Sequence, residues 1–293
     1  MTQPTPFARG ATPPSRELPA TNNPGMRFYL TTHKKHWLRE TPVALFLKSE
    51  HLASAVKPLQ PRGRYAVDSG GFTELQRHGR WTRTPRQYVQ DLRRIWEHVG
   101  PYDWAAGQDW MCEDLIINGG QAGPLTFAGT HLSVAEHQRR TVRNFLELRS
   151  IAPTLRIIPT LQGSTIPEYH QCADLYESYG VNLRAEPIVG LGSVCRLQST
   201  RQGAAIVTAM AARGYRLHGF GFKTLGLARV GHLLASADSA AWSSHARRRP
   251  PLPGHTHLNC ANCIDYALMW RTRVLNSLPP QPGSPTTGLG AAA

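Results

Sequence analysis

The stretch RYAVDSGGFTEL, residues 64–75, decides the fold, because it joins a short apolar run to a turn that carries a carboxylate. Residues 64–68 have the composition of a buried β-strand, and the Ser-Gly-Gly that follows has the composition of a turn. Apolar runs closed by carboxylate, carboxamide, serine or glycine recur along the rest of the chain. This succession predicts parallel strands whose carboxyl ends meet at one rim.

Eight apolar runs have the length and composition of strands. They cover residues 26–30, 43–47, 64–68, 103–109, 155–162, 186–192, 215–221 and 233–239. Apolar residues at helical spacing lie between most of these runs, at 85–98, 133–150, 167–180, 200–213 and 224–232. Pro85, Pro167 and a Ser133–Glu136 capping box mark the expected starts of three helices.

Eight strands that alternate with helices predict an α/β protein with a (β/α)8 TIM barrel. A doubly wound sheet is the alternative, because periodicity alone does not separate the two architectures. Neither a GxGxxG nor a GxxxxGK(S/T) motif follows an early strand, which weakens the nucleotide-binding form of that alternative.

Composition and charge limit the domain organisation and the partners. The chain has 293 residues, 41% of them hydrophobic, which suffices for one large domain with a sizeable core. Residues 1–25 and 278–293 lack periodicity and are rich in Pro and Thr, so we expect a disordered arm and tail around a barrel at 26–277. The 33 Lys and Arg against 19 Asp and Glu give a formal net charge of +14. This balance favours a polyanion partner over a basic surface that is only solvated.

Cysteine usage and hydropathy indicate the compartment. Five cysteines, an odd number, do not suggest a disulfide framework. The sequence shows no signal peptide and no apolar run of the roughly 20 residues that span a bilayer. We therefore expect a reduced, cytoplasmic protein without a membrane partner.

Polar residues and glycines close most of the predicted strands. They are Asp68 with Ser69, Gly70 and Gly71; Gln108 and Asp109; Gln162 and Gly163; Gly190, Leu191, Gly192 and Ser193; Asp238 and Ser239. In a barrel these ends share the rim where active sites form, and glycine lets a flat ligand approach the backbone. A single Asp after a strand is commonly a helix cap, but the joint occurrence on consecutive strand ends favours a site.

The ordered set DSGGF (68–72), QG (162–163), VGLG (189–192) and DS (238–239) resembles the tRNA-guanine transglycosylase superfamily. The resemblance extends from about Met26 to Trp270. Four stretches are closer to the DpdA-like branch, which inserts 7-deazapurines into DNA. They are QDWMCE (108–113), GLGSVCR (190–196), LHGFGFKTLGL (217–227) and SADSAAW (236–242).

The resemblance implies a base-exchange pentosyltransferase that replaces guanine in DNA with a 7-deazaguanine of the preQ0 type. It implies that Asp238 is the nucleophile on the sugar C1′ and that Asp68 is the general acid and base. The implied base-binding residues are Ser69, Gly70, Gly71, Asp109, Gln162, Gly163, Gly190 and Leu191. The same chemistry on tRNA, of the queuosine or archaeosine type, is the first alternative, and a non-catalytic basic nucleic-acid-binding barrel is the second.

The chemistry of the glycosidic bond agrees with this set of carboxylates. Breaking the bond builds positive charge on the sugar, which a carboxylate below C1′ stabilises and can capture covalently. A second carboxyl group must then move a proton on and off the bases. Two carboxyl groups at one rim push their pKa values apart, which suits one nucleophile and one acid.

The segment GHTHLNCANC (254–263) predicts a structural zinc site. His255, His257, Cys260 and Cys263 have zinc-ligand spacing within the segment 254–275. Transglycosylases carry structural zinc here through a CxCxxC cluster and a later His, and this chain departs from that pattern. The remaining ligands would come from His255 and His257, or from His232 or His245; alternatively, the two cysteines only pack a terminal helix.

The other three cysteines have no His base beside them. We expect Cys112 and Cys195 to line the base pocket without acting as nucleophiles, and Cys172 to lie in the core.

Basic residues near the strand ends predict a path for the nucleic acid. We expect phosphate or base contacts from Arg80, Trp81, Arg83, Lys223, Arg247 and Arg248. Trp81 would either stack on an exposed base or cover the barrel as core. The expected partners are DNA, or alternatively tRNA, a 7-deazapurine base as co-substrate, and accessory proteins that open the duplex.

Overall fold

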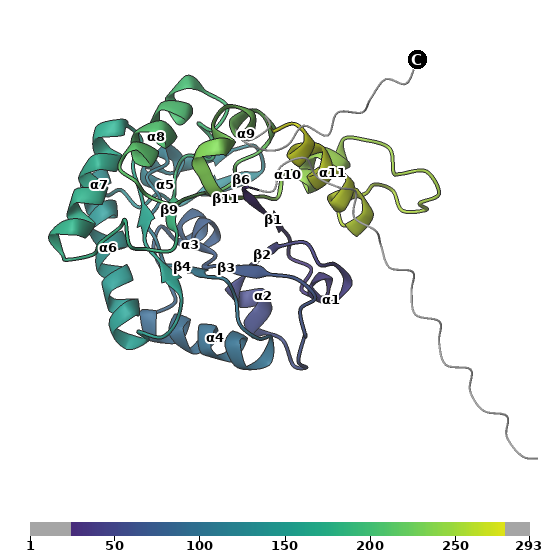
Figure 1. The fold of residues 1–293 in the computed structure, drawn as a ribbon, viewed down its shortest axis with the longest axis horizontal. Coiled ribbons are helices and arrows are strands. Elements are labelled where there is room, and N and C mark those ends of the chain that lie inside the picture. Colours follow the sequence, from purple (N-terminus) through teal and green to yellow (C-terminus); the bar gives the residue numbers. More distant parts are fainter. Residues whose placement is uncertain (1–24, 279–293) are drawn as a thin grey trace, which may run out of the picture.

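The computed structural model describes residues 25–278, and its main feature is one curved parallel sheet (Figure 1). The strands of this sheet are β1 (Arg27–Thr31), β2 (Leu45–Lys48), β3 (Tyr65–Asp68), β4 (Ala105–Ala106), β7 (Ile157–Ile158), β8 (Thr160–Leu161), β9 (Val189–Leu191), β10 (Leu217–Gly219) and β11 (Leu234–Ser239). Their hydrogen-bonded order is β7-β4-β3-β2-β1-β11-β10-β9-β8. The predicted arm and tail lie outside the described residues except for Gly25 and Leu278, and Leu278 is buried against the core.

The sheet curls into a barrel because its two outermost strands are neighbours in the chain. Ile157 and Ile158 pair with β4, whereas Thr160 and Leu161 pair with β9. Pro159 stands between them, and proline has no N–H to contribute to a ladder. The predicted strand 155–162 is therefore split in two, and the predicted (β/α)8 barrel is confirmed.

Alternation along the strands sorts side chains to the inside and the outside of the barrel. Phe28 and Leu30 of β1 belong to the large core under the helices, whereas Tyr29 points to the other face. The inner cluster is made of Tyr29, Phe46, Ala66, Trp104, Ala106 and Ile158, with Ala44, Ile188 and Phe220 packed on it. The barrel centre is thus filled by side chains, as is usual for this architecture.

Helices surround the sheet in Figure 1. They are α1 (Trp37–Glu40), α2 (Ser49–Ala53), α3 (Gly71–His78), α4 (Pro85–His98), α5 (Asp114–Asn118), α6 (Val134–Ile151), α7 (Ile166–Ser178), α8 (Arg201–Ala212), α9 (Thr224–Val230), a 3-10 turn η1 (Gly231–Leu233), α10 (Ala241–Arg247) and α11 (Ile264–Asn276). Among them, α4, α6, α7, α8 and α9 lie close to the five predicted ranges. The first two connections carry helices of only four and five residues. Helices this short do not show a hydrophobic periodicity in the sequence.

Helix starts follow local capping chemistry, with one correction. Thr84 forms a full capping box with Gln87 at the start of α4, and Pro85 is at its first turn. At α6, Ser133 accepts from the backbone N–H of Glu136, but the Glu136 carboxylate binds Arg139 and Arg140 instead of returning to the cap. The predicted capping box at Ser133 is therefore only half formed.

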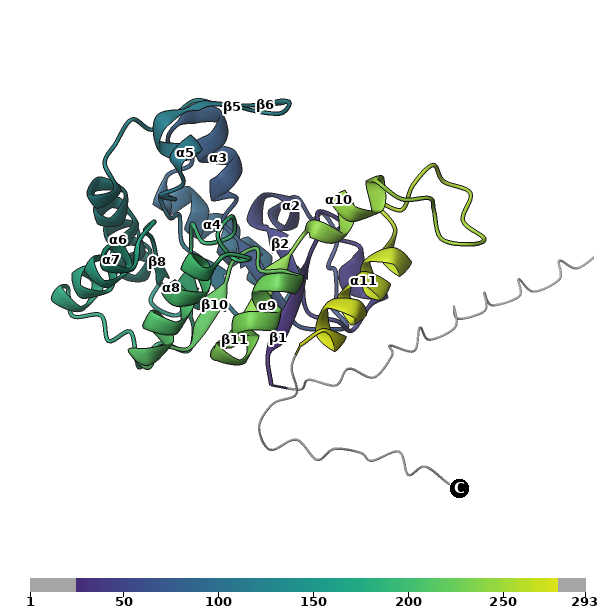
Figure 2. The same cartoon turned by 90° about the horizontal axis from the view of Figure 1, so that it is seen from above.

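Two additions extend the barrel, a hairpin near its carboxyl-terminal rim and a pair of helices beside β1. The hairpin of β5 (Gly120–Ala122) and β6 (Leu125–Phe127) lies above α3 and α5 in Figure 2. Its attachment to α3 includes a hydrogen bond of 2.9 Å from the Ala128 N–H to the Gln76 carbonyl. On the other side, α10 and α11 pack together beside β1. Of the helices between residues 25 and 278, none is both long and apolar enough to cross a bilayer.

Candidate active site

A cavity of about 340 Å3 opens at the carboxyl ends of the strands. Three carboxyl groups from distant parts of the chain line it: Asp68 at the end of β3, Asp109 after β4, and Asp238 near the end of β11. The parallel arrangement brings these strand ends to one rim, although 170 positions separate Asp68 and Asp238 in the sequence. A volume of this size is within the roughly 300–1,000 Å3 of small-ligand sites.

Asp238 is held in one orientation by hydrogen bonds to both carboxylate oxygens. The Thr31 hydroxyl donates to Oδ2 at 2.6 Å, and the Gly221 backbone N–H donates to Oδ1 at 2.9 Å. Gly221 has a φ of +69°, and a Cβ there would lie 2.8 Å from Cβ of Cys195. Only glycine adopts this positive φ and fits beside Cys195 without strain. The absence of a side chain at residue 221 therefore lets its N–H reach the carboxylate.

His218 is a buried neighbour of Asp238 that the sequence analysis did not single out. Its Nδ1 lies 2.9 Å from the Ser236 hydroxyl, and its Nε2 lies 3.4 Å from Oδ1 of Asp238. That second approach lacks hydrogen-bond geometry, and Nε2 has no hydrogen-bond partner among residues 25–278. The ring is fully buried, 4.6 Å from the ring of Trp104 and 4.5 Å from that of Phe220. His218 comes before the end of β10, so its place in the sequence does not mark it as a residue of the rim.

Asp68 lines the same cavity from the end of β3. Its Oδ1 accepts from the Gly70 N–H at 2.9 Å, and Gly70 has a φ of +85°, which glycine adopts readily. Burial among protein atoms raises the pKa of Asp68, and the charge of Asp238 adds to this, against the lowering effects of the Gly70 N–H and Lys48. The carboxyl group therefore keeps its proton to a higher pH than an ordinary aspartate.

Asp109 is the third carboxyl group, and the Gln162 carboxamide holds it through a hydrogen bond. Burial raises its pKa to about 7, with a further contribution from the charge of Asp68. The Gln162 carboxamide donates to Oδ2, and its own Oε1 accepts from the Ser193 hydroxyl at 2.6 Å. A Cβ at Gly192 would lie 2.1 Å from Nε2 of Gln162, so this glycine leaves the space that the carboxamide occupies.

The walls of the cavity are largely apolar. Phe46, Ala106, Met111 and Phe220 line it, together with Phe72, which keeps 40% of its surface exposed. Flat apolar side chains of this kind suit the faces of a heterocycle, whereas the carboxyl groups suit its edge.

A fourth carboxylate at the wall, Glu113, was missed although it lies in the quoted stretch QDWMCE. It accepts from the Cys195 thiol at 3.3 Å and pairs with Arg196 at 3.1 Å. The sequence signal was present, because Glu113 follows the β4 end by a few residues. Gln108 and Asp109 are the residues predicted at this strand end, and Glu113 is not among them.

The predicted base-binding residues fall into two groups. Ser69, Gly71 and Asp109 line the cavity. Gly70, Gln162, Gly163, Gly190 and Leu191 lie outside its lining. On β9 the side chain of Leu191 belongs to the outer core, and a Cβ at Gly190 would meet Phe220 at 2.6 Å. The part of this segment that reaches the cavity is Gly192 and Ser193, two residues further along.

The predicted nucleic-acid contacts also divide. Arg80, Lys223, Arg247 and Arg248 are exposed. Arg83 is half-buried and paired with Asp91 at 2.8 Å. The Trp81 indole donates to the Asp109 carbonyl at 3.1 Å and lies 3.0 Å from where a Cβ of Gly71 would be. This packing supports the covering role for Trp81 rather than an open stacking platform.

The cysteines outside the Cys/His segment lie as follows. Cys195 lines the cavity, whereas Cys112 is buried outside its lining. Burial raises the pKa of Cys195 to about 12, which makes it a poor nucleophile. Cys172 is fully buried in α7, which confirms the expectation that it is core.

The Cys/His segment between α10 and α11 brings four ligand atoms together. Those of His255, His257, Cys260 and Cys263 all lie within 4.8 Å of one another. His257 Nε2 is 3.0 Å from Sγ of Cys260, and His255 Nδ1 is 3.6 Å from Sγ of Cys263. Four ligands around one centre could hold a metal ion without help from His232 or His245. The latter is 2.5 Å from the Tyr266 hydroxyl instead.

Fold and site together define a parallel α/β-barrel protein with a carboxylate-lined cavity at the carboxyl ends of its strands. A family model described as DpdA, DeoxyPurine in DNA protein A, matches residues 25–292, and the chain therefore belongs to the DpdA family. The DpdA-like resemblance of the four quoted stretches is thereby confirmed. No curated protein matches the chain.

Proposed function

We propose that this chain exchanges guanine in DNA for a 7-deazaguanine base, of the preQ0 type, through a covalent sugar–enzyme intermediate. The observation that carries the proposal is the convergence of Asp68, Asp109 and Asp238 on one cavity of about 340 Å3. The DpdA family, whose name refers to deoxypurine in DNA, supports DNA as the substrate.

In the first half of the reaction, an oxygen of Asp238 bonds to C1′ of the nucleotide. The C1′–N bond breaks at the same time, and guanine leaves with the bonding electrons. Asp68 donates a proton to the leaving base, for which its raised pKa is suited. Thr31 and Gly221 hold the carboxylate toward the sugar while its remaining lone pairs attack.

In the second half, the incoming 7-deazapurine occupies the same cavity. Asp68, now ionised, removes the proton from its ring nitrogen, and that nitrogen bonds to C1′. The bond between C1′ and Asp238 breaks, and the carboxylate leaves with its electrons. The reaction balances without oxidant or cofactor, because one base and one proton enter and one base and one proton leave.

Asp109 is the proposed reader of the purine edge. A guanine-type base presents two N–H donors there, and the ionised carboxylate accepts both, whereas the protonated form lacks one acceptor. Gln162 and Ser193 act through Asp109 by holding its orientation. Gln162 is a positioning residue, since it does not line the cavity, and Ser193, which does, holds the Gln162 carboxamide in place.

Base binding is expected to strengthen as the pH rises. With a pKa of about 7 for Asp109, the ionised fraction rises about tenfold between pH 6 and pH 8, and the affinity for guanine rises by up to the same factor. Calorimetric titration with guanine at the two pH values measures this. Asp109→Asn should remove the pH dependence, whereas Asp68→Asn should keep it but move it to lower pH, because the charge of Asp68 contributes to the raised pKa of Asp109. A dependence that survives Asp109→Asn would contradict the role of Asp109.

The function itself is tested by the fate of labelled guanine. The chain should incorporate it into DNA, and not into tRNA, when each polymer is supplied with and without the accessory proteins of the same cell. Label in tRNA alone would favour the tRNA alternative. Salt-sensitive binding that is unaffected by loss of Asp68, Asp109 and Asp238 would favour the non-catalytic alternative.

The exposed Arg80, Lys223, Arg247 and Arg248 are the proposed contacts to phosphates.

We also propose that the Cys/His segment holds structural zinc. Zinc prefers four N and S ligands at about 2.0–2.3 Å, which matches the donor set and its spacing. Asp265, with Oδ2 3.8 Å from Nε2 of His255, is placed to orient that imidazole. The ion would tie the loop after α10 to the start of α11.

Removal of one ligand should release the metal. Cys263→Ser is expected to lower bound zinc from about one per chain to near zero, measured by atomic emission. The free energy of unfolding should fall by about 4 kcal/mol at free zinc 1,000-fold above the dissociation constant. Cys195→Ser, also at a half-buried cysteine, should keep its zinc. Retention of zinc by Cys263→Ser would contradict the assignment of Cys263 as a zinc ligand.

A further inference from the structure

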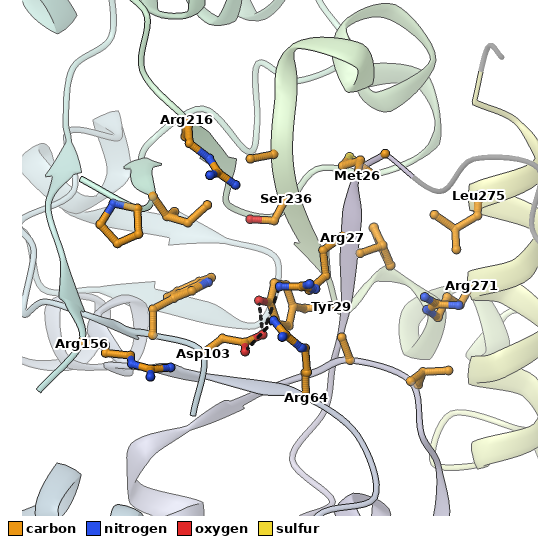
Figure 3. A pocket seen from close by; sticks show the side chains of 18 of the residues that line it. Met26, Arg27, Tyr29, Arg64, Asp103, Arg156, Arg216, Ser236, Arg271 and Leu275 are labelled. Carbon is orange, nitrogen blue, oxygen red and sulfur yellow. Dashed lines mark hydrogen bonds and ion pairs between the residues drawn. The ribbon is translucent and has the colours of Figure 1, made fainter. Parts of the chain in front are cut away.

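A second, larger cavity of about 700 Å3 lies at the amino-terminal end of the barrel (Figure 3). Its wall includes the first residues of β1, the segments that lead into β3, β4, β7 and β10, and one face of α11. The inner cluster of the barrel, with Tyr29 and Trp104 on this side and Phe46 and Ala106 on the other, separates it from the carboxylate cavity. The proposed base exchange makes no use of this end.

Five arginines from five different elements line this cavity. Arg27 is in β1, Arg64 and Arg156 directly precede β3 and β7, Arg216 directly precedes β10, and Arg271 is in α11. In Figure 3 their side chains surround the opening from several sides. The four arginines at or before strand starts lie at one end of the barrel because parallel strands begin at the same edge, and Arg271 joins them from α11 to form the arginine ring.

The positive charge of this ring is only partly neutralised. Asp103 is the one carboxylate among the described residues that line the cavity, and it pairs with Arg27 at 3.4 Å and with Arg64 at 3.3 Å. Within residues 25–278, Arg156, Arg216 and Arg271 form no ion pair. Five guanidinium groups against one carboxylate leave four positive charges in excess.

Two polar atoms of residues that line the cavity are buried without a partner among residues 25–278. Nε of Arg271 and Nε1 of Trp104 are buried and have no hydrogen-bond partner in the described chain. A buried donor without a partner costs stability, and an unpaired guanidinium costs more than a neutral group. Burial also lowers the pKa of Arg271 to about 10, which shows how unfavourable its charge is without an anion.

We infer that this cavity binds a small polyphosphate of nucleotide size, with its phosphate groups between the arginines. Guanidinium groups bind phosphate oxygens in bidentate fashion, and their number here exceeds what one phosphate needs. The apolar lining of Pro42, Val43, Pro187 and Ile188 beside Trp104 leaves room for an organic group such as a nucleoside. The concave shape favours a small ligand over the convex backbone of a duplex.

The test is calorimetric titration of the full chain at physiological ionic strength with inorganic tripolyphosphate, ATP and GTP. Saturable binding of at least one of them is expected. The double variant Arg156→Gln/Arg216→Gln should weaken it by roughly tenfold or more for each guanidinium lost. Both arginines are exposed, so these changes leave the core intact. Arg201→Gln, at an exposed arginine that lines neither cavity, is the matched control and should bind as the unchanged chain does.

Three results would overturn the inference. One is the absence of saturable binding by any of the three phosphates. Another is an equal loss of affinity in the double variant and in Arg201→Gln. The third is binding of a single-stranded oligonucleotide that depends on Arg156 and Arg216, while the small phosphates do not bind. That result would assign the cavity to a nucleic-acid backbone. None depends on base exchange, so failure of the proposed function leaves this test valid.

Discussion

Replacing Asp238 by asparagine is expected to lower base exchange by roughly 10⁴-fold or more, since the amide cannot form the bond to C1′. The fold should tolerate the change. The amide oxygen can accept from the Gly221 N–H, and the Thr31 hydroxyl can turn to accept from the new NH2 group. The measurement is trapping of a covalent protein–DNA species on a denaturing gel, followed by mass spectrometry of the modified peptide.

The control for this variant is Asp174→Asn. Asp174 is an aspartate of α7 that pairs with Arg213 on the surface, and its replacement should leave the covalent species and the exchange rate unchanged. A covalent species that still forms in Asp238→Asn, at a similar rate, would remove Asp238 as the nucleophile. The catalytic reading of the cavity would then have to rest on another carboxylate.

Replacing Asp68 by asparagine is expected to slow exchange by roughly 10²–10⁴-fold, the usual contribution of a general acid or base. Binding of DNA should persist, because the amide oxygen can still accept from the Gly70 N–H. Since burial and the charge of Asp238 raise the pKa of Asp68, the acid form supports the first half-reaction at low pH and is lost as the pH rises through that pKa. The variant should lose this part of the pH–rate profile.

A leaving base that needs no proton separates the role of Asp68 from a structural one. DNA that carries 7-methylguanine has a base that is already positively charged, so its departure requires no acid. Asp68→Asn should therefore release 7-methylguanine at nearly the rate of the unchanged chain, while release of guanine stays slow. Equal impairment on both substrates would show that Asp68 acts on the shape of the site and not on a proton.

Local pattern was a sufficient guide to most of the barrel. The α4 range was predicted to the residue, because Thr84, Pro85 and the apolar spacing all act within one helix. The strand at 155–162 was found but its division was not, since the effect of Pro159 depends on which strands pair on either side. The hairpin at residues 120–127 was missed, because its short strands pack on α3 and lack a periodic signal of their own.

Some residues of the site can be found from the sequence, and others only from the fold. Asp68, Asp109 and Asp238 were found as polar residues that close apolar runs, and all three line the cavity. The base-binding prediction names Gly190 and Leu191, whereas Gly192 and Ser193 line the cavity. The sequence does not show at which residue of a strand the cavity begins. His218 lies in the quoted stretch LHGFGFKTLGL, but nothing in that stretch places it beside Asp238, and the arginine ring carries no motif. Only the pairing of β10 with β11 and the closure of the sheet bring those groups together.

The sequence by itself determined the strand-and-helix alternation, the family resemblance and the carboxyl groups at the strand ends, because each depends on residues adjacent in the chain or on their order. Tertiary structure decided which of these groups share a cavity, which donors orient them and how burial shifts their pKa values. It also decided that charges spread over almost 250 positions collect at the opposite end. The physical reason is that desolvation and electrostatic interaction depend on distance in space, and barrel closure makes near neighbours of residues that the chain keeps far apart.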